Sequence, residues 1–220
     1  MKNLAARFLG EADRENVRRR VREVEASTSA EIVPLIRSAS SAYRTALLRG
    51  SLAAGTVVAA AATALDAAYK PWGTLSLVDL WVFPVVFAIC FAVVFLTSSW
   101  VPSLAKVLVS RGEMSEEVAE AAITAFYRHR VSETRGRTGI LLFVSVFERR
   151  VVVLADAGIS AKVPQGAWQQ VVDIVLEGIR EGRAVDGLCR AITRCGEIVA
   201  AQLPIAADDT NELGDLIVED

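Results

Sequence analysis

The chain has 220 residues, which is enough for one domain of ordinary size with an additional element and too few for a large multidomain enzyme. Its 24 Lys and Arg against 26 Asp and Glu give a net charge of −2, and a hydrophobic content of 53% excludes a disordered chain. The mean hydropathy of +0.38 is high for a purely soluble protein, so one part of the chain must be unusually apolar.

The first predicted element is an amphipathic helix over Glu11–Ala26. Val17, Val21 and Val24 follow the i, i+4, i+7 spacing of a single helix face. The arginines of this segment are interleaved with glutamates, which favours a solvated helix face over a nucleic-acid or lipid surface.

A first strand is predicted over Ala30–Arg37, a short segment rich in branched apolar side chains. Pro34 has no backbone N–H to donate to a neighbouring strand. The strand should therefore lie at a sheet edge or contain a bulge.

A transmembrane hairpin is predicted next. Leu80–Ser98 contains no charge over nineteen residues. A helix of that length, at about 1.5 Å per residue, nearly crosses a hydrocarbon core of roughly 30 Å. The Ala-rich segment Gly50–Leu65 is also uncharged, and Tyr69–Asp79 resembles a short interfacial loop. We expect spans at about 50–68 and 80–98.

Basic residues set the expected orientation of this hairpin. They lie before the first span (Arg37, Arg44, Arg49) and after the second (Lys106, Arg111), with Lys70 alone between the spans. Short loops rich in Lys and Arg face the cytoplasm. The first thirty residues contain no apolar segment typical of a signal peptide. The sequence thus predicts a two-pass protein of the inner (plasma) membrane with both termini in the cytoplasm.

Two stripes of side chains suggest how the spans pack. One is small (Ser51, Gly55, Ala59) and the other is bulky (Phe83, Phe87, Phe91, Phe95). Large side chains against small ones allow two helices to approach closely. The bulky stripe facing lipid, with the small one pairing with another protein, is the alternative.

The rest of the chain alternates between helix and strand. Ser115 is expected to cap a helix whose first turn carries Glu116 and Glu117. Gly139–Val146 and Arg150–Ala155 are continuous apolar runs, which indicate strands covered on both faces. Two amphipathic helices follow, with apolar stripes over 168–179 and 185–199. Strands between helices give an α/β layer architecture.

The last sixteen residues contain six acids and no base. Such a segment is expected to be disordered or loosely docked. The predicted organisation is therefore a helix and first strand over 1–38, an inserted hairpin over 39–112, the remainder of the domain over 113–204, and an acidic tail over 205–220.

Three segments carry a family resemblance. They are EASTSAEIVPLI (Glu25–Ile36), TRGRTGILLFVSVFERRVVVLADAGISAKVPQGAW (Thr134–Trp168) and GLCRAITRCGEIVAAQLP (Gly187–Pro204). Together they resemble the TPM domain, named for thylakoid-lumen, photosystem-repair and levamisole-receptor-associated proteins, and more narrowly its bacterial membrane proteins. The resemblance implies a mixed β-sheet sandwiched between helices, which the hairpin would interrupt. Arg135, Gly136 and Arg137 stand where a more acidic turn or one containing Asn is expected.

Candidate site residues lie at the expected strand ends. Asp156 ends a buried strand and Gly158 follows it, while Glu31 begins the first strand and Thr134 precedes the second. Carboxylates with backbone carbonyls can hold a hard cation, so Asp156 and Glu31 are candidate ligands for Ca²⁺ or Mg²⁺. Trp168 completes the candidate binding set. The alternative is that Asp156 caps a turn, Glu31 is solvated and Trp168 anchors the core.

Other chemistries find little support. His129 is the single histidine, and the sequence has no nucleotide-binding glycine motif and no Cys/His cluster of metal spacing. We therefore expect no nucleic-acid or nucleotide partner. The favoured function is a non-enzymatic accessory or assembly and quality-control factor, whose partners are the lipid bilayer and other membrane proteins. Some relatives are credited with phosphatase activity, so the resemblance also implies a metal-dependent acid phosphatase as the alternative.

Overall fold

The computed structural model describes residues 4–69, 77–101, 106–205 and 211–219. The chain divides into two compact units, one formed by Met1–Ser41 with Ser115–Asp220 and the other by Ala42–Met114. Most of the interfacial loop expected between the two spans lies outside the described residues.

The first unit alternates helices and strands. Its helices are α1 (Leu4–Phe8), α2 (Glu11–Glu25), most of α6 (Arg111–Arg128), α7 (Ala157–Ser160), α8 (Trp168–Arg180) and α9 (Ala184–Ala200). Its strands are β1 (Glu31–Arg37), β2 (Gly139–Ser145), β3 (Arg150–Ala155) and β4 (Ile217–Glu219). Short 3₁₀ turns cover Val131–Glu133 and Gln165–Ala167.

The strands form one mixed sheet in the order β3-β2-β1-β4. β1 runs parallel to both β2 and β4, whereas β2 and β3 are antiparallel. Strand β1 precedes the hairpin in sequence and β2 follows it, yet the two pair over their full length from Glu31–Gly139 to Arg37–Ser145. This arrangement confirms the predicted fold class of a mixed sheet between helices.

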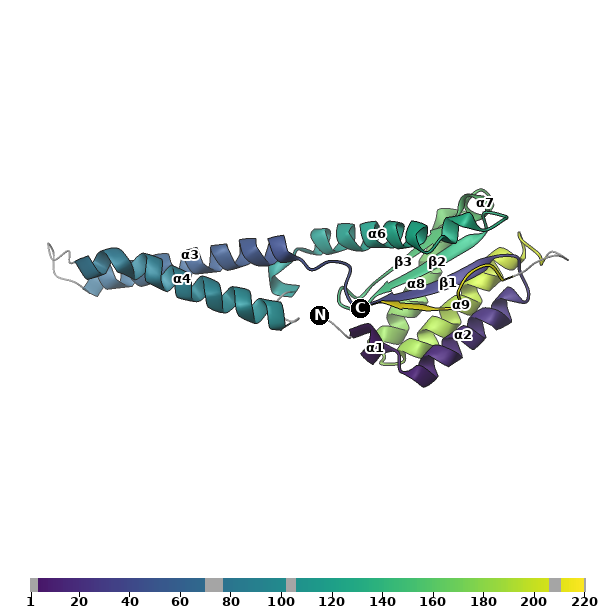
Figure 1. Ribbon diagram of the computed structural model, residues 1–220, viewed down its shortest axis with the longest axis horizontal. Coiled ribbons are helices and arrows are strands. Elements are labelled where there is room, and N and C mark those ends of the chain that lie inside the picture. The colour runs from purple at the N-terminus through teal and green to yellow at the C-terminus, as the bar shows by residue number, and fades with distance from the viewer. Residues whose placement is uncertain (1–3, 70–76, 102–105, 206–210, 220) are drawn as a thin grey trace. The chain divides into compact units, whose positions relative to one another are not determined.

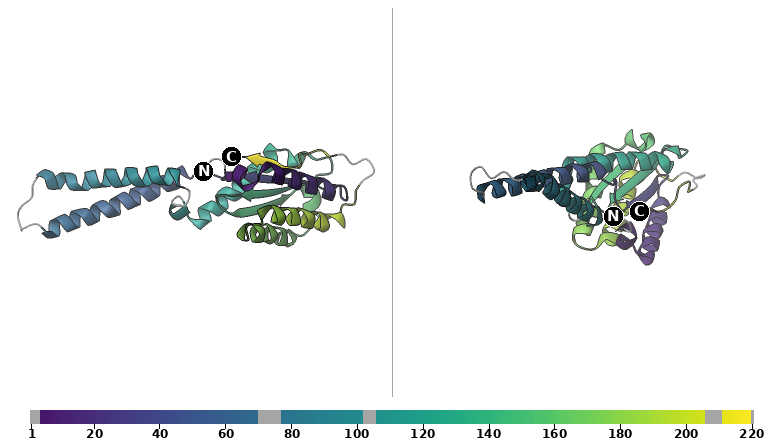
Figure 2. Two further views of the ribbon diagram at one scale, coloured as in Figure 1. Left: turned by 90° about the horizontal axis from the view of Figure 1, so that it is seen from below. Right: turned by 60° about the vertical axis from the view of Figure 1, so that its left-hand side comes forward.

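Helices cover both faces of the sheet, as Figures 1 and 2 show. Ile32 and Ile36 pack into an apolar core with α2, α8 and α9. Val33 and Leu35 point to the other face and pack with α6. Successive side chains of a strand alternate between faces. The apolar runs lack alternation because both faces are buried.

Helix α6 begins earlier than the sequence analysis placed it. Ser110 supplies the cap, since its Oγ accepts a hydrogen bond from Glu113 N at 3.1 Å. Ser115 lies inside the helix, where its Oγ accepts from Arg150 Nη1 at 3.3 Å. The expected cap at Ser115 was therefore wrong, because an equivalent serine occurs five residues earlier.

Within the predicted acidic tail over 205–220, residues 211–219 dock against the first unit, so the loosely docked alternative describes them and disorder does not. Ile217–Glu219 forms β4 and pairs with Leu35–Arg37 of β1. Apolar side chains within the tail pack against the cores on either side of the sheet. Composition alone pointed to disorder because the acids outnumber these apolar residues.

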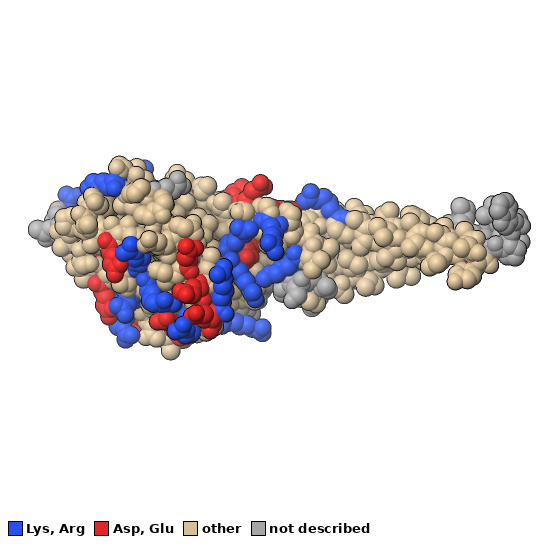
Figure 3. All heavy atoms as spheres, turned by 180° about the vertical axis from the view of Figure 1, so that it is seen from behind, with Lys and Arg blue, Asp and Glu red and all other residues tan. Residues whose placement is uncertain are grey.

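The second unit contains helices α3 (Arg44–Tyr69) and α4 (Leu77–Trp100). Residues Arg44–Tyr69 and Trp81–Ser98 are long and apolar enough to cross a membrane. Gly55 is buried, and a Cβ added to it would lie 3.1 Å from the Phe87 ring. Gly55 of the small stripe therefore lies against Phe87 of the bulky stripe, whereas Phe83 of the same stripe is 40% exposed. On the face in view in Figure 3, the outer surface of the hairpin is almost free of charge.

Candidate functional site

Asp156 ends β3 and caps the short helix α7. Its backbone N donates to Gly139 O at 2.9 Å, which closes the β2–β3 ladder. Its Oδ1 accepts a hydrogen bond from Ala157 N at 2.7 Å, and the residue has the extended backbone of a helix N-cap. The side chain is nearly buried, with 5% exposed. One carboxylate oxygen is thus committed to the turn.

Arg137 faces the other oxygen of this carboxylate. Its Nε lies 2.9 Å from Asp156 Oδ2, an ion pair without the alignment of a hydrogen bond. The backbone of Arg137 is left-handed, with φ of 54°. The arginine side chain is 59% exposed, so water reaches the guanidinium while the carboxylate stays buried. The pair therefore neutralises Asp156 from the solvent side.

The loop that carries Arg137 is held together by Thr134. Thr134 Oγ1 accepts from Thr138 N at 2.9 Å, and Thr134 O accepts from Arg137 N at 3.0 Å. Both threonines are buried. We name residues 134–138 the arginine loop.

Gly158 lies directly against the arginine loop. Its N donates to Arg137 O at 3.0 Å. A Cβ added to Gly158 would lie 2.6 Å from Gly136 O and 2.7 Å from Arg137 O, closer than any side chain can sit. Glycine is therefore required here, because only a residue without a Cβ lets the two backbones approach so closely. Its N–H stabilises the arginine loop through the hydrogen bond to Arg137 O.

Glu31 lies at the same end of the sheet. Its N donates to Thr138 O at 3.1 Å, and its Oε1 accepts from Glu212 N at 3.3 Å. Glu212 in turn accepts a hydrogen bond from Arg135 N at 3.0 Å through its own carboxylate. The acidic tail thus links Glu31 to the arginine loop.

Four of the five candidate residues therefore meet at one end of the sheet, and Trp168 does not. Trp168 packs into the core shared by α2, α8 and α9 and is 7% exposed. The contacts of Arg137 and Glu212 were not predicted from the sequence. The sequence signal for Arg137 was the Arg-Gly-Arg stretch at 135–137, which departs from the family pattern. Nothing in the tail distinguished Glu212 from the other acids.

The arrangement does not fit Ca²⁺ or Mg²⁺. One carboxylate oxygen of Asp156 accepts a hydrogen bond from Ala157 N, and the other lies beside the Arg137 guanidinium. A metal cation at that second oxygen would be repelled by the positive charge of Arg137. Among the described residues, no three His, Cys, Asp or Glu side chains gather as metal ligands.

His129 and Glu219 form a second polar cluster, at the opposite end of β1. His129 Nε2 lies 2.9 Å from Glu219 Oε1, and Arg128 and Arg37 lie 3.5 and 3.7 Å from the same carboxylate. Ser38 N donates to Glu219 O at 3.0 Å. The histidine therefore holds β4 and is not arranged as a catalytic base beside a nucleophile.

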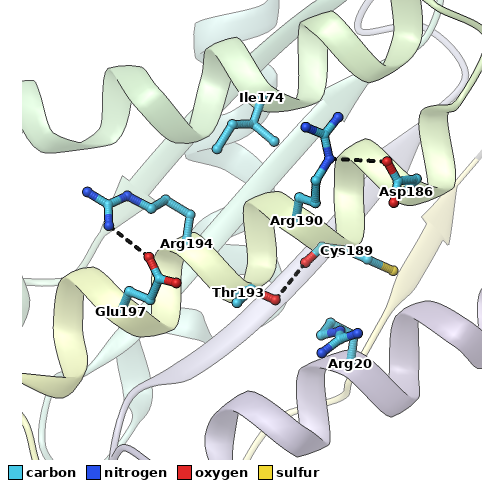
Figure 4. Close-up of a pocket in the computed structure, with 8 residues that line it drawn as sticks. All are labelled: Arg20, Ile174, Asp186, Cys189, Arg190, Thr193, Arg194 and Glu197. Carbon is cyan, nitrogen blue, oxygen red and sulfur yellow. Dashed lines mark hydrogen bonds and ion pairs between the residues drawn. The ribbon is translucent and has the colours of Figure 1, made fainter.

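A shallow hollow of about 340 Å³ lies between α2, α8 and α9 (Figure 4). Its arginines are already paired, as Arg190 with Asp186 at 3.1 Å and Arg194 with Glu197 at 2.8 Å. Burial raises the pKa of the Cys189 thiol at its edge, which disfavours the nucleophilic thiolate. Basic and acidic side chains also intermingle on the face of the first unit that is in view in Figure 3. The arginines of the hollow therefore already have acidic partners within the chain.

An α/β unit with a mixed sheet, joined to two helices of membrane-spanning length, defines the class of this protein. Residues 101–198 match the family model of the TPM domain. This stretch is therefore similar to the TPM domain, the family that the sequence resembles. No curated protein matches the chain.

One solved structure has a similar fold. It is the NMR structure of the BA42 protein from the psychrophilic bacterium Bizionia argentinensis, with a TM-score of 0.57 and 16% sequence identity. The similarity covers 97% of this chain and 96% of that chain. At this identity the likeness establishes the fold alone.

Proposed function

We propose that this protein is a membrane-anchored accessory factor that assists the assembly or quality control of other membrane proteins and catalyses no reaction. The observation that carries this proposal is the Arg137–Asp156 pair. The carboxylate best placed for chemistry is neutralised by a cation of the chain itself and caps a turn. A carboxylate that acts as a general acid or base must reach its substrate, whereas both oxygens of this one are committed within the chain.

The proposed membrane arrangement is a two-pass hairpin in the inner membrane with both termini in the cytoplasm. Strands β1 and β2 belong to one sheet although the hairpin separates them in sequence. This pairing supports a hairpin that crosses the membrane an even number of times, with both of its ends on one side. The basic residues that flank the spans favour the cytoplasmic side.

The outer surface of the hairpin is the proposed contact with lipid and client helices. Val57 on α3 and Ile89 and Val93 on α4 are more than half exposed. Large apolar side chains in such numbers need a covering of lipid or of other transmembrane helices. This exposed apolar surface therefore supports the proposal that the hairpin contacts lipid and other transmembrane helices.

Photo-crosslinking in intact membranes tests the proposal. A photoreactive amino acid replaces Val57 or Ile89 in the full chain, and crosslinked proteins are purified and identified. A matched control places it at Tyr127, an exposed site on α6 of the first unit. We expect specific integral membrane proteins to crosslink through the hairpin positions. Crosslinks to lipid alone would contradict a client-binding role.

A separate assay addresses the phosphatase alternative. The purified full chain is incubated with a generic phosphomonoester and with Ca²⁺ or Mg²⁺. We expect no turnover above that of the Asp156→Asn variant. Metal-dependent hydrolysis that this substitution abolishes would overturn the non-enzymatic proposal.

A further inference from the structure

Basic residues flank the two long apolar helices at one end of the second unit. Residues 52–69 and 77–101, which form most of α3 and α4, contain no Lys or Arg. The flanking segments 42–51 and 106–114 contain four bases and one acid, which gives them a net charge of +3. We name the four bases the basic end of the hairpin: Arg44, Arg49, Lys106 and Arg111.

The two flanking segments lie against each other. Arg49 Nη2 donates to Glu113 Oε1 at 3.1 Å, although 64 residues separate them in sequence. A Cβ added to Gly50 would lie 2.8 Å from the Leu108 side chain, so the segment after α4 packs closely on the second turn of α3. Lys106 and Arg111 are each two residues from one of these contacts. All four bases therefore belong to one surface of the second unit.

The basic end contains less negative charge than positive charge. The first turn of α3 has no acidic residue. Arg44 is exposed, and it has no acidic partner among the residues that the structure describes. Arg49 pairs with Glu113, yet its side chain remains 65% exposed. Because like charges held close together repel each other, an anion from outside the chain would stabilise this surface.

Exposed apolar side chains lie within the basic end. Val107 follows Lys106 directly and is 80% exposed, and Leu48 precedes Arg49 and is 43% exposed. At the boundary between lipid headgroups and acyl chains, apolar side chains enter the acyl region while Lys and Arg reach the phosphates. An acidic protein segment would match only the charge of this surface. An anionic lipid matches both its charge and its apolar side chains.

We propose that the basic end of the hairpin binds the headgroup of an anionic phospholipid, with Arg44, Arg49 and Lys106 contacting the phosphate and Val107 among the acyl chains. This inference rests on the proposed membrane arrangement and adds the class of lipid that is recognised. Binding holds the start of α3 and the segment after α4 at the same depth in the membrane. Attraction to anionic lipid is worth roughly fivefold in affinity for each base near the surface.

Native mass spectrometry of the full chain tests the proposal. The protein is equilibrated in detergent with equal amounts of phosphatidylglycerol and phosphatidylcholine that have the same acyl chains, and the retained lipids of each kind are counted. The variants are Arg44→Gln, Arg49→Gln and Lys106→Gln, one at a time. Arg130→Gln is the matched control, because Arg130 is an exposed arginine of the first unit that pairs with Glu133 at 3.7 Å.

We expect the parent chain to retain phosphatidylglycerol in excess over phosphatidylcholine. Each substitution at the basic end should lower this excess by roughly fivefold, whereas the control should leave it unchanged. Val107→Asn should lower the retention of both lipids and keep their ratio, since the acyl chains are the same. Inorganic phosphate should not displace phosphatidylglycerol, because it has no acyl chain to contact Val107.

Equal retention of the two lipids by the parent chain would overturn the proposal, and so would an unchanged excess in all three variants of the basic end. Displacement by inorganic phosphate would show a site for a free anion and would also overturn it. Circular dichroism and gel filtration verify that each variant is folded, and the three variants are independent of one another. The detergent mixture contains no client protein, so the outcome is distinguishable from that of the crosslinking experiment.

Discussion

The guanidinium of Arg137 lies 2.9 Å from the nearly buried carboxylate of Asp156, across the turn that joins β3 to α7. This contact links two loops that are almost twenty residues apart in sequence. It also explains why the strand-end site does not fit a metal ion, because the negative charge of Asp156 is neutralised by Arg137 of the same chain.

Arg137→Gln should lower the free energy of unfolding by about 1 kcal/mol, a modest value because the exposed guanidinium is screened by solvent. The loss should shrink in the Asp156→Asn background, since asparagine keeps the Oδ1 acceptor for Ala157 N and carries no charge to neutralise. Urea unfolding of the two single variants and the double variant measures this coupling. Strictly additive losses would show that the two side chains do not interact.

Calcium should leave the melting temperature of the parent chain unchanged, because Arg137 occupies the position that a cation would need. A ligand present at 100 times its dissociation constant would stabilise the protein by about 2.7 kcal/mol. Calorimetry with and without Ca²⁺ measures the melting temperature, and the Asp156→Asn variant is the matched control. A calcium-dependent rise that disappears in this variant would restore Asp156 as a metal ligand.

The elements of the α/β unit were predictable where hydrophobic patterns were long. β3 begins and ends at the predicted residues, and β1 and β2 differ from prediction by one residue at one end. The strand-end position of Asp156 and Glu31 followed from the same patterns. The partners of these residues did not, because Arg137 depends on a left-handed loop and Glu212 on pairing of the distant tail. Neither the Arg137–Asp156 contact nor the Glu212–Glu31 contact produces a periodic sequence pattern from which it could be predicted.

Gly158→Ala should destabilise the first unit by about 1–3 kcal/mol, since the new methyl group would overlap two backbone oxygens of the arginine loop. Backbone atoms cannot move aside as a flexible side chain can. The control is Gly166→Ala, where an added Cβ meets nothing within 4 Å. Thermal unfolding of both variants tests the difference, and equal melting temperatures would contradict the close approach.

Gly55→Leu should weaken the hairpin by about 1 kcal/mol or more, because the Phe87 ring already lies 3.1 Å from where a Cβ would stand. Ala60→Leu is the control, since Ala60 is exposed on the same helix. Melting in detergent and gel-filtration size report the effect. If both variants behave like the parent, α3 and α4 do not pack through Gly55.

Cys195 should make stability depend on alkaline pH. The thiol is fully buried in α9, and this burial raises its pKa from 9.0 to about 12. The folded state thus holds the proton where the unfolded state releases it, so the stabilisation is complete below pH 9.0 and is lost as the pH rises toward about 12. Urea unfolding at several values from pH 8 to about 10.5 should give a falling free energy of unfolding, with a shallower fall in Cys195→Ala. Iodoacetamide provides an independent measurement, because a neutral buried thiol reacts only when the chain opens. Rapid alkylation of Cys195 in the native chain, or an identical pH slope in the alanine variant, would contradict its burial in the core.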